Sequence, residues 1–321
     1  MSKDAPADDP MLRPRYTGLA SFMRAPYRDH DWSGVEIGMI GVPYDGGVTN
    51  RPGARHGPRE IRNQSSLIRR INQATGVCPY DLCQVADLGD AWIEKPYELE
   101  GALDEIAAFF GDVHDRGITP LSAGGDHSVT LPILRAVARD RPLGLVHFDA
   151  HCDTGDDYLG SKFHHGAPFR RAVEEGLLDP KRCIQIGIRG SLNDMDLWSF
   201  SHDQGMRVIY IEEFYELGVK GVIAEAQRVV GTGPAYLSFD VDGLDPVYAP
   251  GTGTPEVGGF STLEAQLMLR GLAGLNFVGG DVVEVSPPFD PSGNTALVGA
   301  TMMFEILCLL AQSRVARVAR V

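Results

Sequence analysis

Short apolar runs alternate with longer amphipathic stretches from residue 35 onward. The runs predict strands at 35–41, 84–88, 118–122, 143–148, 183–187, 207–211, 235–240 and 277–285. The amphipathic stretches predict helices at 57–66, 98–115, 128–139, 166–176, 219–229, 262–274 and 296–312. Nearly continuous apolar strands between helices are typical of a parallel sheet that is covered on both faces. The pattern therefore predicts a three-layer α/β/α fold with a mainly parallel sheet of about eight strands.

The periodicity also predicts the division of the chain. Residues 1–34 have weak periodicity, and we expect them to form an irregular arm. No low-complexity linker or repeat interrupts residues 35–321, which we predict to be a single domain. Met1–Pro10 lacks the apolar core of a signal peptide. The most apolar segment, Ala300–Ala311, is too short to span a bilayer and contains Glu305, so we expect it to form a buried helix.

Composition excludes several classes of protein. A net charge of −14 argues against binding to nucleic acid, because phosphates require a basic surface. The five cysteines form no CxxC pair and no disulfide framework, which is typical of a reducing compartment. We therefore expect a cytoplasmic protein that binds neither nucleic acid nor a membrane.

Acidic and imidazole side chains gather where the predicted strands end. The candidate ligands are His127, Asp149, His151, Asp153, Asp240 and Asp242. Several of them lie two residues apart, so in an extended chain they point to the same side. The carboxyl ends of parallel strands meet at one edge of the sheet, where ligand sites form. Four carboxylates and two imidazoles suit Mn²⁺, Ni²⁺ or Co²⁺ better than a soft thiolate site would.

Such a set of ligands points to hydrolysis. Two ions about 3.5–4 Å apart can generate hydroxide near neutral pH, and hydroxide can attack a trigonal carbon. Cys152 alternates to the opposite face and is not counted as a ligand. Asp126 and Asp245 are expected to cap a helix or close a turn. The glycine-rich run 250–255 lacks the Gly-Lys-Ser/Thr ending of a phosphate loop, so we interpret it as a rigid loop beside the site.

Three motifs resemble the signatures of a known family. GGDHS at 124–128, DAHCD at 149–153 and SFDVDGLDPVYAPGTGTPEVGG at 238–259 are similar to those of the ureohydrolases, the arginase and agmatinase superfamily. The resemblance extends from about residue 36 to about residue 312. Segments 50–59, 169–176 and 283–288 resemble the agmatinase-like branch that contains guanidinopropionases and guanidinobutyrases. The resemblance implies an arginase/deacetylase-like fold and hydrolysis of a guanidino group to urea and an amine.

The resemblance also implies residue roles. One metal would be held by His127, Asp149, Asp153 and Asp240, and the second by Asp149, His151, Asp240 and Asp242. Asp149 and Asp240 would bridge the ions, and Asp149 counts among the catalytic residues for that reason. Glu284 matches the carboxylate that binds the guanidinium, a pairing that suits bidentate hydrogen bonds. His165 matches the histidine that passes a proton to the leaving amine, with the adjacent His164 as the alternative.

The motifs leave the substrate open. Arginases recognise the substrate carboxylate with an asparagine two positions after the DAHxD motif, where this chain has Gly155. Tyr158, in the acidic loop 154–160, either narrows the substrate-binding pocket or is a half-buried loop aromatic. Arg55 and Arg59 are either carboxylate partners or structural residues. We predict a guanidino acid such as 3-guanidinopropionate or 4-guanidinobutyrate. The alternatives are agmatine and, with nickel, guanidine, alkylguanidines or biguanides such as metformin.

The resemblance also implies cofactors and assembly. We expect two divalent ions per subunit, Mn²⁺ first and Ni²⁺ as the alternative, and a homo-oligomer, either a hexamer or a trimer. A non-catalytic subunit of a hetero-oligomer is a further alternative, but the complete ligand set favours an active enzyme. A deacetylase-type amide hydrolase on the same fold is disfavoured by the second set of His and Asp ligands.

Overall fold

Eight parallel strands form the centre of the molecule. The structure, a computed structural model, describes residues 13–28 and 30–319. The strands are β1 (Ile37–Val42), β2 (Val85–Asp90), β3 (Thr119–Gly124), β4 (Leu143–Phe148), β5 (Leu178–Ile188), β6 (Arg207–Tyr210), β7 (Pro234–Asp240) and β8 (Asn276–Val283). They pair in the order β2-β1-β3-β8-β7-β4-β5-β6, and every pairing is parallel. The predicted parallel sheet is confirmed.

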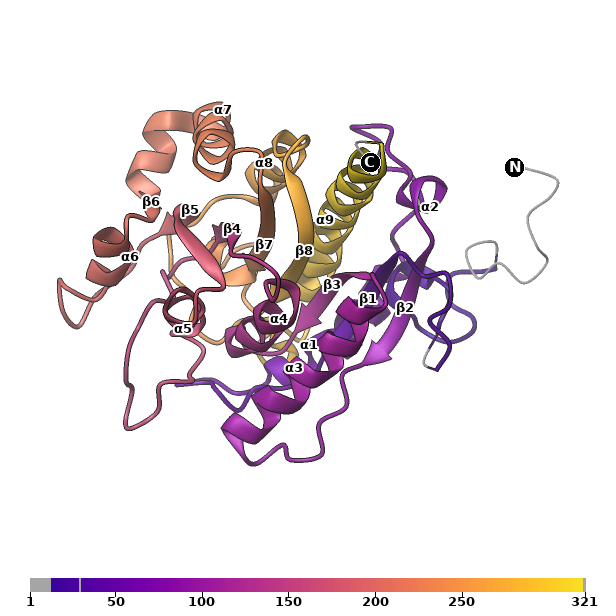
Figure 1. The fold of residues 1–321 in the computed structure, drawn as a ribbon, viewed down its shortest axis with the longest axis horizontal. Coiled ribbons are helices and arrows are strands. Elements are labelled where there is room, and N and C mark those ends of the chain that lie inside the picture. Colours follow the sequence, from indigo (N-terminus) through magenta and orange to yellow (C-terminus); the bar gives the residue numbers. More distant parts are fainter. Residues whose placement is uncertain (1–12, 29, 320–321) are drawn as a thin grey trace.

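Helices cover both faces of the sheet (Figure 1). They are α1 (Gly57–Ser65), α2 (Pro79–Leu82), α3 (Leu99–Asp115), α4 (Thr130–Val137), α5 (Pro168–Glu174), α6 (Ser199–Gln204), α7 (Ile211–Val230), α8 (Thr262–Gly271) and α9 (Asn294–Val318). Apolar side chains of α1, α7, α8 and α9 share one buried cluster, and those of α3, α4 and α5 share another. The two clusters lie on opposite faces of the sheet, which gives the predicted three layers and explains why the strands are apolar on both sides.

The order of the strands assembles the chemistry. Strands β3, β8, β7 and β4 are neighbours in the middle of the sheet, although they are far apart in the sequence. The last residue of β7 and the segments that follow these four strands carry all the predicted ligands and Glu284. Parallel pairing brings their carboxyl ends to one edge, so four distant motifs meet there.

Three predicted elements are shorter than the observed ones, and the helices predicted at 128–139, 166–176 and 262–274 are longer than α4, α5 and α8. The strand predicted at 183–187 begins at Leu178, and the helix predicted at 219–229 is the last part of α7, which begins at Ile211. Gly218 adopts a φ of 65° inside α7, so the apolar periodicity is interrupted there and the first turns escaped detection. The helix predicted at 296–312 is α9, which is longer at both ends. Helices α2 and α6 were not predicted because four and six residues are too few to show a period.

Helix α9 lies mainly in the core, as predicted for the apolar segment Ala300–Ala311. Its length and composition would allow it to cross a membrane, but 83% of its apolar window is buried inside the protein. Its one acidic residue in that region, Glu305, accepts hydrogen bonds from Asn72 at 2.7 Å and from the Arg270 guanidinium at 2.5 Å. These contacts compensate the buried charge, as the core of a soluble domain requires.

The described part of the predicted arm packs against the body. Phe22 and Met23 are buried in the cluster that includes α9, and the Phe22 N–H donates to Asp87 at 2.8 Å. Residues 1–12 lie outside the described part of the chain. The division at residue 34 and the single domain after it remain predictions.

Candidate active site

The six predicted ligands meet at the carboxyl edge of the sheet. Around His127 Nδ1 lie carboxylate oxygens of Asp149 at 3.2 Å, Asp153 at 2.9 Å and Asp240 at 3.1 Å. Around His151 Nδ1 lie oxygens of Asp149 at 3.4 Å and Asp242 at 3.2 Å. The two imidazoles approach different oxygens of Asp149, so this carboxylate stands between two groups of ligands, as a bridging ligand would.

Turns bring these side chains together. The prediction that they converge by alternation along an extended strand is therefore wrong. Strand β4 ends at Phe148, before the first ligand of its motif. The Asp149 carboxylate accepts the N–H of His151 at 2.6 Å, and the chain then reaches Asp153 with a φ of 51°. Asp242 lies in a 3-10 turn, Val241–Gly243, whose start is capped by the Asp240 side chain. In a non-glycine residue, backbone strain at such a φ costs about 1–3 kcal/mol, and residues with this strain cluster at functional sites.

The cluster fits divalent metal ions. His127 Nδ1 is fully buried and has no hydrogen-bond partner among the described residues, although three carboxylate oxygens surround it. Burial and the neighbouring carboxylates raise the pKa of Asp240 well above its usual value and raise the pKa of Asp242 to about 6. Cations between these groups would remove the mutual repulsion and use the Nδ1 lone pair. Groups of these side chains have ligand atoms within 4.8 Å of one another.

His147 was not counted in the sequence analysis but belongs to the cluster. Its Nε2 lies 2.7 Å from the Asp149 carboxylate, and its Nδ1 lies 3.1 Å from the Gln185 amide. Because the Gln185 N–H donates to Nδ1, Nε2 carries the proton and donates to Asp149. His147 lies two residues before Asp149, so the alternation argument would have found it within the strand itself.

A buried polar chain behind His127 was also missed. His127 Nε2 lies 2.8 Å from Ser238 Oγ, which donates to Asp281 at 2.6 Å. The other oxygen of Asp281 accepts from Thr130 at 2.8 Å and from Tyr236 at 2.9 Å. Ser238 lies two residues before Asp240, so spacing offered a signal for it. The contribution of Asp281 depends on the register of β7 with β8, which the sequence does not reveal.

Glu284 and His165 form a pair beside the ligands. Glu284 Oε1 accepts the N–H of His127 at 2.9 Å and lies 2.8 Å from His165 Nδ1. Glu284 Oε2 is buried and has no partner among the described residues. Burial acts to lower the pKa of His165, but the charge and hydrogen bond of Glu284 outweigh it and raise the pKa to about 9. Glu284 has a φ of 64°, a second strained backbone at the site.

The two adjacent histidines have different environments. His165 is 7% exposed, and its Nε2 lies 2.7 Å from the Thr49 hydroxyl. His164 uses both nitrogens locally, since Nδ1 accepts the N–H of Gly166 at 3.2 Å and Nε2 lies 3.1 Å from the Asp156 carbonyl oxygen. His165 is therefore the better candidate for proton transfer, as predicted from its place before Gly166.

A cavity of about 220 Å³ opens beside the ligand cluster. Gly155 and Tyr158, which are predicted to lie at the substrate, both line this cavity, and Tyr158 is 47% exposed. Glu284 is not in the lining, so its predicted contact with the guanidinium depends on the buried Oε2. Arg55 pairs with Asp45, and neither Arg55 nor Arg59 lines the cavity.

The aspartate side chains of loop 154–160 do not line this cavity. The Asp156 carboxylate pairs with Arg170 at 3.0 Å and with Arg171 at 2.8 Å. Asp157 accepts the N–H of Gly160 at 2.8 Å. Neither carboxylate lines the cavity, so the loop supplies no anionic partner for a substrate ammonium group.

The remaining predictions for nearby residues are confirmed. Asp126 caps the 3-10 turn His127–Val129 by accepting the N–H of Ser128. Asp245 accepts the N–H groups of Val247 and Gly258 and so closes a turn. The buried Cys152 packs in a separate apolar cluster with residues such as Trp198.

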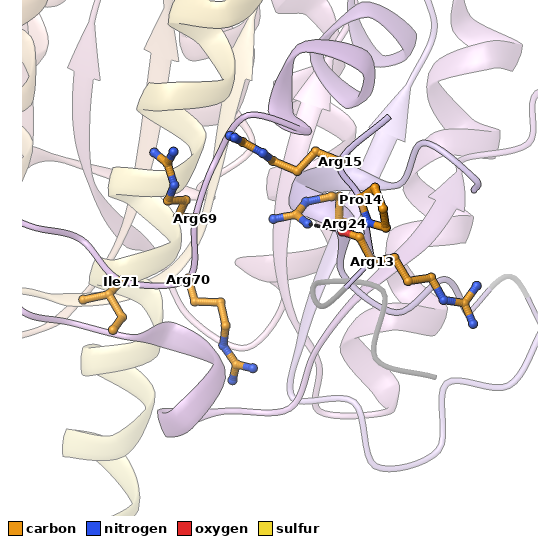
Figure 2. Close-up of a pocket in the computed structure, with 7 residues that line it drawn as sticks. All are labelled: Arg13, Pro14, Arg15, Arg24, Arg69, Arg70 and Ile71. Carbon is orange, nitrogen blue, oxygen red and sulfur yellow. Dashed lines mark hydrogen bonds between the residues drawn. The ribbon is translucent and has the colours of Figure 1, made fainter. Parts of the chain in front are cut away.

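A second cavity has the opposite electrostatic character. It measures about 540 Å³ and is lined by five arginines, from residues 13–24 and 69–70, together with Pro14 and Ile71 (Figure 2). A cationic guanidinium would be repelled from such a lining. This cavity is therefore not the site for a guanidino substrate.

An all-parallel α/β sheet with carboxylates and imidazoles at its carboxyl edge defines a class of enzymes that use paired divalent ions for hydrolysis. Known proteins agree with this class. The Arginase family matches residues 35–309. The chain is 59% identical over 315 residues to guanidinopropionase from Pseudomonas aeruginosa, covering 98% of each chain. It is 48% identical over 297 residues to mitochondrial agmatinase from Gallus gallus, covering 92% of this chain and 87% of that protein.

A solved structure gives the same result. Proclavaminate amidinohydrolase from Streptomyces clavuligerus matches with a TM-score of 0.90 and 40% identity, over 94% of this chain and all of that chain (100%). The chain belongs to the arginase family, and with it to the hydrolases that act on carbon–nitrogen bonds of linear amidines. The resemblance to the ureohydrolases and their agmatinase-like branch is confirmed.

Proposed function

We propose that this enzyme hydrolyses a short guanidino acid to urea and an amino acid, with 3-guanidinopropionate as the best substrate and 4-guanidinobutyrate second. The observation that carries the proposal is the paired ligand cluster beside a small cavity that is not lined by the carboxylates of loop 154–160. The 59% identity to guanidinopropionase supports the choice of substrate. Agmatine is the alternative, since an agmatinase is also a relative.

The ligand cluster is proposed to hold two divalent ions, Mn²⁺ first and Ni²⁺ as the alternative. His127, Asp149, Asp153 and Asp240 would hold one, and Asp149, His151, Asp240 and Asp242 the other. When bound, the pair supplies Lewis acidity and an activated water near neutral pH. His147 contacts the ligand Asp149, and Ser238 contacts the ligand His127. These contacts would orient the two ligands.

The remaining steps depend on the chain's own side chains. Glu284 Oε2 is proposed to accept a guanidinium N–H, which positions the guanidino carbon beside the ligand cluster. His165 is held at Nδ1 by Glu284, while Nε2 is near the cavity-lining hydroxyl of Thr49. The raised pKa keeps a proton on His165 at neutral pH, and that proton is available to the leaving amine when the carbon–nitrogen bond breaks.

Assembly and location are also part of the proposal. We expect a homo-oligomer, either a hexamer or a trimer, in the cytoplasm, with residues 35–321 as one catalytic domain. The complete ligand set supports an active chain over a non-catalytic subunit.

The test is urea release after separate loading with Mn²⁺ and Ni²⁺. The panel holds 3-guanidinopropionate, 4-guanidinobutyrate, agmatine, arginine, guanidine, dimethylguanidine and metformin. We expect the highest kcat/KM for 3-guanidinopropionate, followed by 4-guanidinobutyrate. A preference for agmatine would support the alternative, and absence of urea from all compounds would support a partner-dependent subunit.

A further inference from the structure

A guanidino acid carries a carboxylate at the end remote from its guanidinium. Of the imidazoles that line the cavity, His165 is paired with Glu284, and His151 faces the carboxylates of Asp149 and Asp242. No lysine or arginine belongs to the cavity lining among the described residues. The nearby Arg170 and Arg171 are already paired with Asp156, and Arg171 is also close to Glu174. A substrate carboxylate must therefore be recognised by neutral hydrogen-bond donors.

Most neutral donors in the lining are already in use. The Thr254 hydroxyl donates to Asp242 at 3.1 Å, and the Thr49 hydroxyl lies 2.7 Å from His165. His164 has both nitrogens engaged by backbone groups. Thr254 and His164 cannot bind a carboxylate without breaking an existing contact, and Thr49 lies beside His165, which the proposed function assigns to the guanidino end of the substrate.

Two N–H-bearing side chains in the lining remain available. Neither the Asn193 amide nor the Trp198 indole has a hydrogen-bond partner in the described part of the chain. Both belong to the segment between β5 and α6, and Asn193 is exposed at the cavity. Trp198 is 7% exposed and packs against Cys152 and Ile188, so its ring is fixed in place.

We propose that the Asn193 amide, together with the Trp198 indole N–H, binds the substrate carboxylate. This inference rests on the proposed function and names the residues that select a guanidino acid within the same site. N–H groups that donate to an ionised carboxylate make stronger hydrogen bonds than neutral pairs do. Asn193 thus supplies from the segment after β5 what Gly155 cannot supply after β4.

The test compares variants of the metal-loaded, full-length enzyme. Asn193→Ala should raise KM for 3-guanidinopropionate roughly 10- to 100-fold with little change in kcat, because the contact is present before and during the reaction. Calorimetric binding of 3-ureidopropionate, an unreactive compound with the same carboxylate, should weaken by a similar factor. Asn193→Asp should weaken both further and raise the agmatine to 3-guanidinopropionate ratio of kcat/KM at least about 10-fold, since like charges repel. Trp198→Phe should show a smaller loss in the same direction.

Met195→Ala is the matched control. Met195 lies in the same loop, is 85% exposed and does not line the cavity, so neither KM nor binding should change. Wild-type values in both Asn193 variants would overturn the inference, as would equal losses for agmatine and 3-guanidinopropionate, which would indicate a distorted loop. If only Tyr158→Phe weakened substrate binding, the Tyr158 hydroxyl would be the group that binds the carboxylate, and the inference about Asn193 would also be overturned. If the wild type releases urea from no guanidino compound, the proposed function fails first and this inference fails with it.

Discussion

Ser238 holds the ring of His127 from the side opposite to the ligand cluster. The Ser238 hydroxyl donates to Asp281 at 2.6 Å, so its oxygen accepts the N–H of His127 Nε2 at 2.8 Å. This arrangement places the proton of the neutral His127 ring on Nε2, while Nδ1 faces the carboxylates of Asp149, Asp153 and Asp240. A buried carboxylate therefore sets, through one hydroxyl, the tautomer that a metal ligand needs.

The first prediction concerns this hydroxyl. Ser238→Ala should weaken metal binding by roughly 10- to 100-fold, the usual effect of removing a group that orients a ligand. Metal affinity is measured by competition with a chelator. Tyr236→Phe is the matched control, because Tyr236 donates to the other oxygen of Asp281 and does not contact His127. Equal losses in the two variants would show that the effect comes from Asp281 in general and not from the His127 tautomer.

The second prediction concerns the proposed bridging carboxylates. Asp149→Ala should remove both metals and all activity, because Asp149 lies between the two groups of ligands. Asp240→Ala should do the same. Asp153→Ala should affect mainly one ion, since Asp153 lies 2.9 Å from His127 Nδ1 and forms no ion pair with His151 in the described part of the chain. The metal content per subunit of each variant, measured after gel filtration, tests these expectations. Two retained ions in Asp149→Ala would rule out its bridging role.

The third prediction separates the two histidines. His165→Ala should keep its metals and lower kcat by about 10²–10⁴-fold, the usual effect of losing a proton-transfer group. His164→Ala should retain more activity, because both of its nitrogens serve the local backbone. Urea release under saturating substrate, with metal content measured in parallel, tests both. A fully active His165→Ala with an inactive His164→Ala would assign the role to His164.

The fourth prediction concerns the fold. Arg270→Met leaves the buried Glu305 with Asn72 as its remaining hydrogen-bond partner among the described residues and should lower the free energy of unfolding by about 1–3 kcal/mol. Arg228→Met removes an exposed pair with Glu225 and should cost no more than about 1 kcal/mol. Urea denaturation of the two variants measures the difference. Equal stabilities would mean that Glu305 is solvated or protonated in the folded protein.

The pattern of the sequence predicted the layers and the ligands for a physical reason. Strands covered on both faces must be apolar throughout, so polar residues at their ends stand out, and parallel topology guarantees that those ends meet. The prediction assumed that side chains alternate beyond Phe148, where the strand has ended and the chain turns. The same alternation holds within the strand, and there it would have pointed to His147 beside Asp149. The predicted ligand residues thus meet in one cluster, but through a local geometry that the alternation rule did not predict.

Other features depend on contacts between distant segments and leave no local pattern. Asp281 reaches Ser238 only through the register of β8 with β7. The acidic composition of loop 154–160 does not give the cavity an Asp156 lining, because the Asp156 carboxylate pairs with two arginines of α5. Asn193 drew no attention in the sequence because a single loop amide has no periodicity and no motif.

The most direct test of a paired metal centre that serves guanidino hydrolysis is a titration. Metal-free enzyme is supplied with increasing equivalents of Mn²⁺, and urea release from 3-guanidinopropionate is measured at each step. The account predicts little activity below one equivalent and a plateau near two equivalents per subunit, because both groups of ligands must be filled. Full activity at one equivalent, or activity that does not depend on added metal, would contradict it.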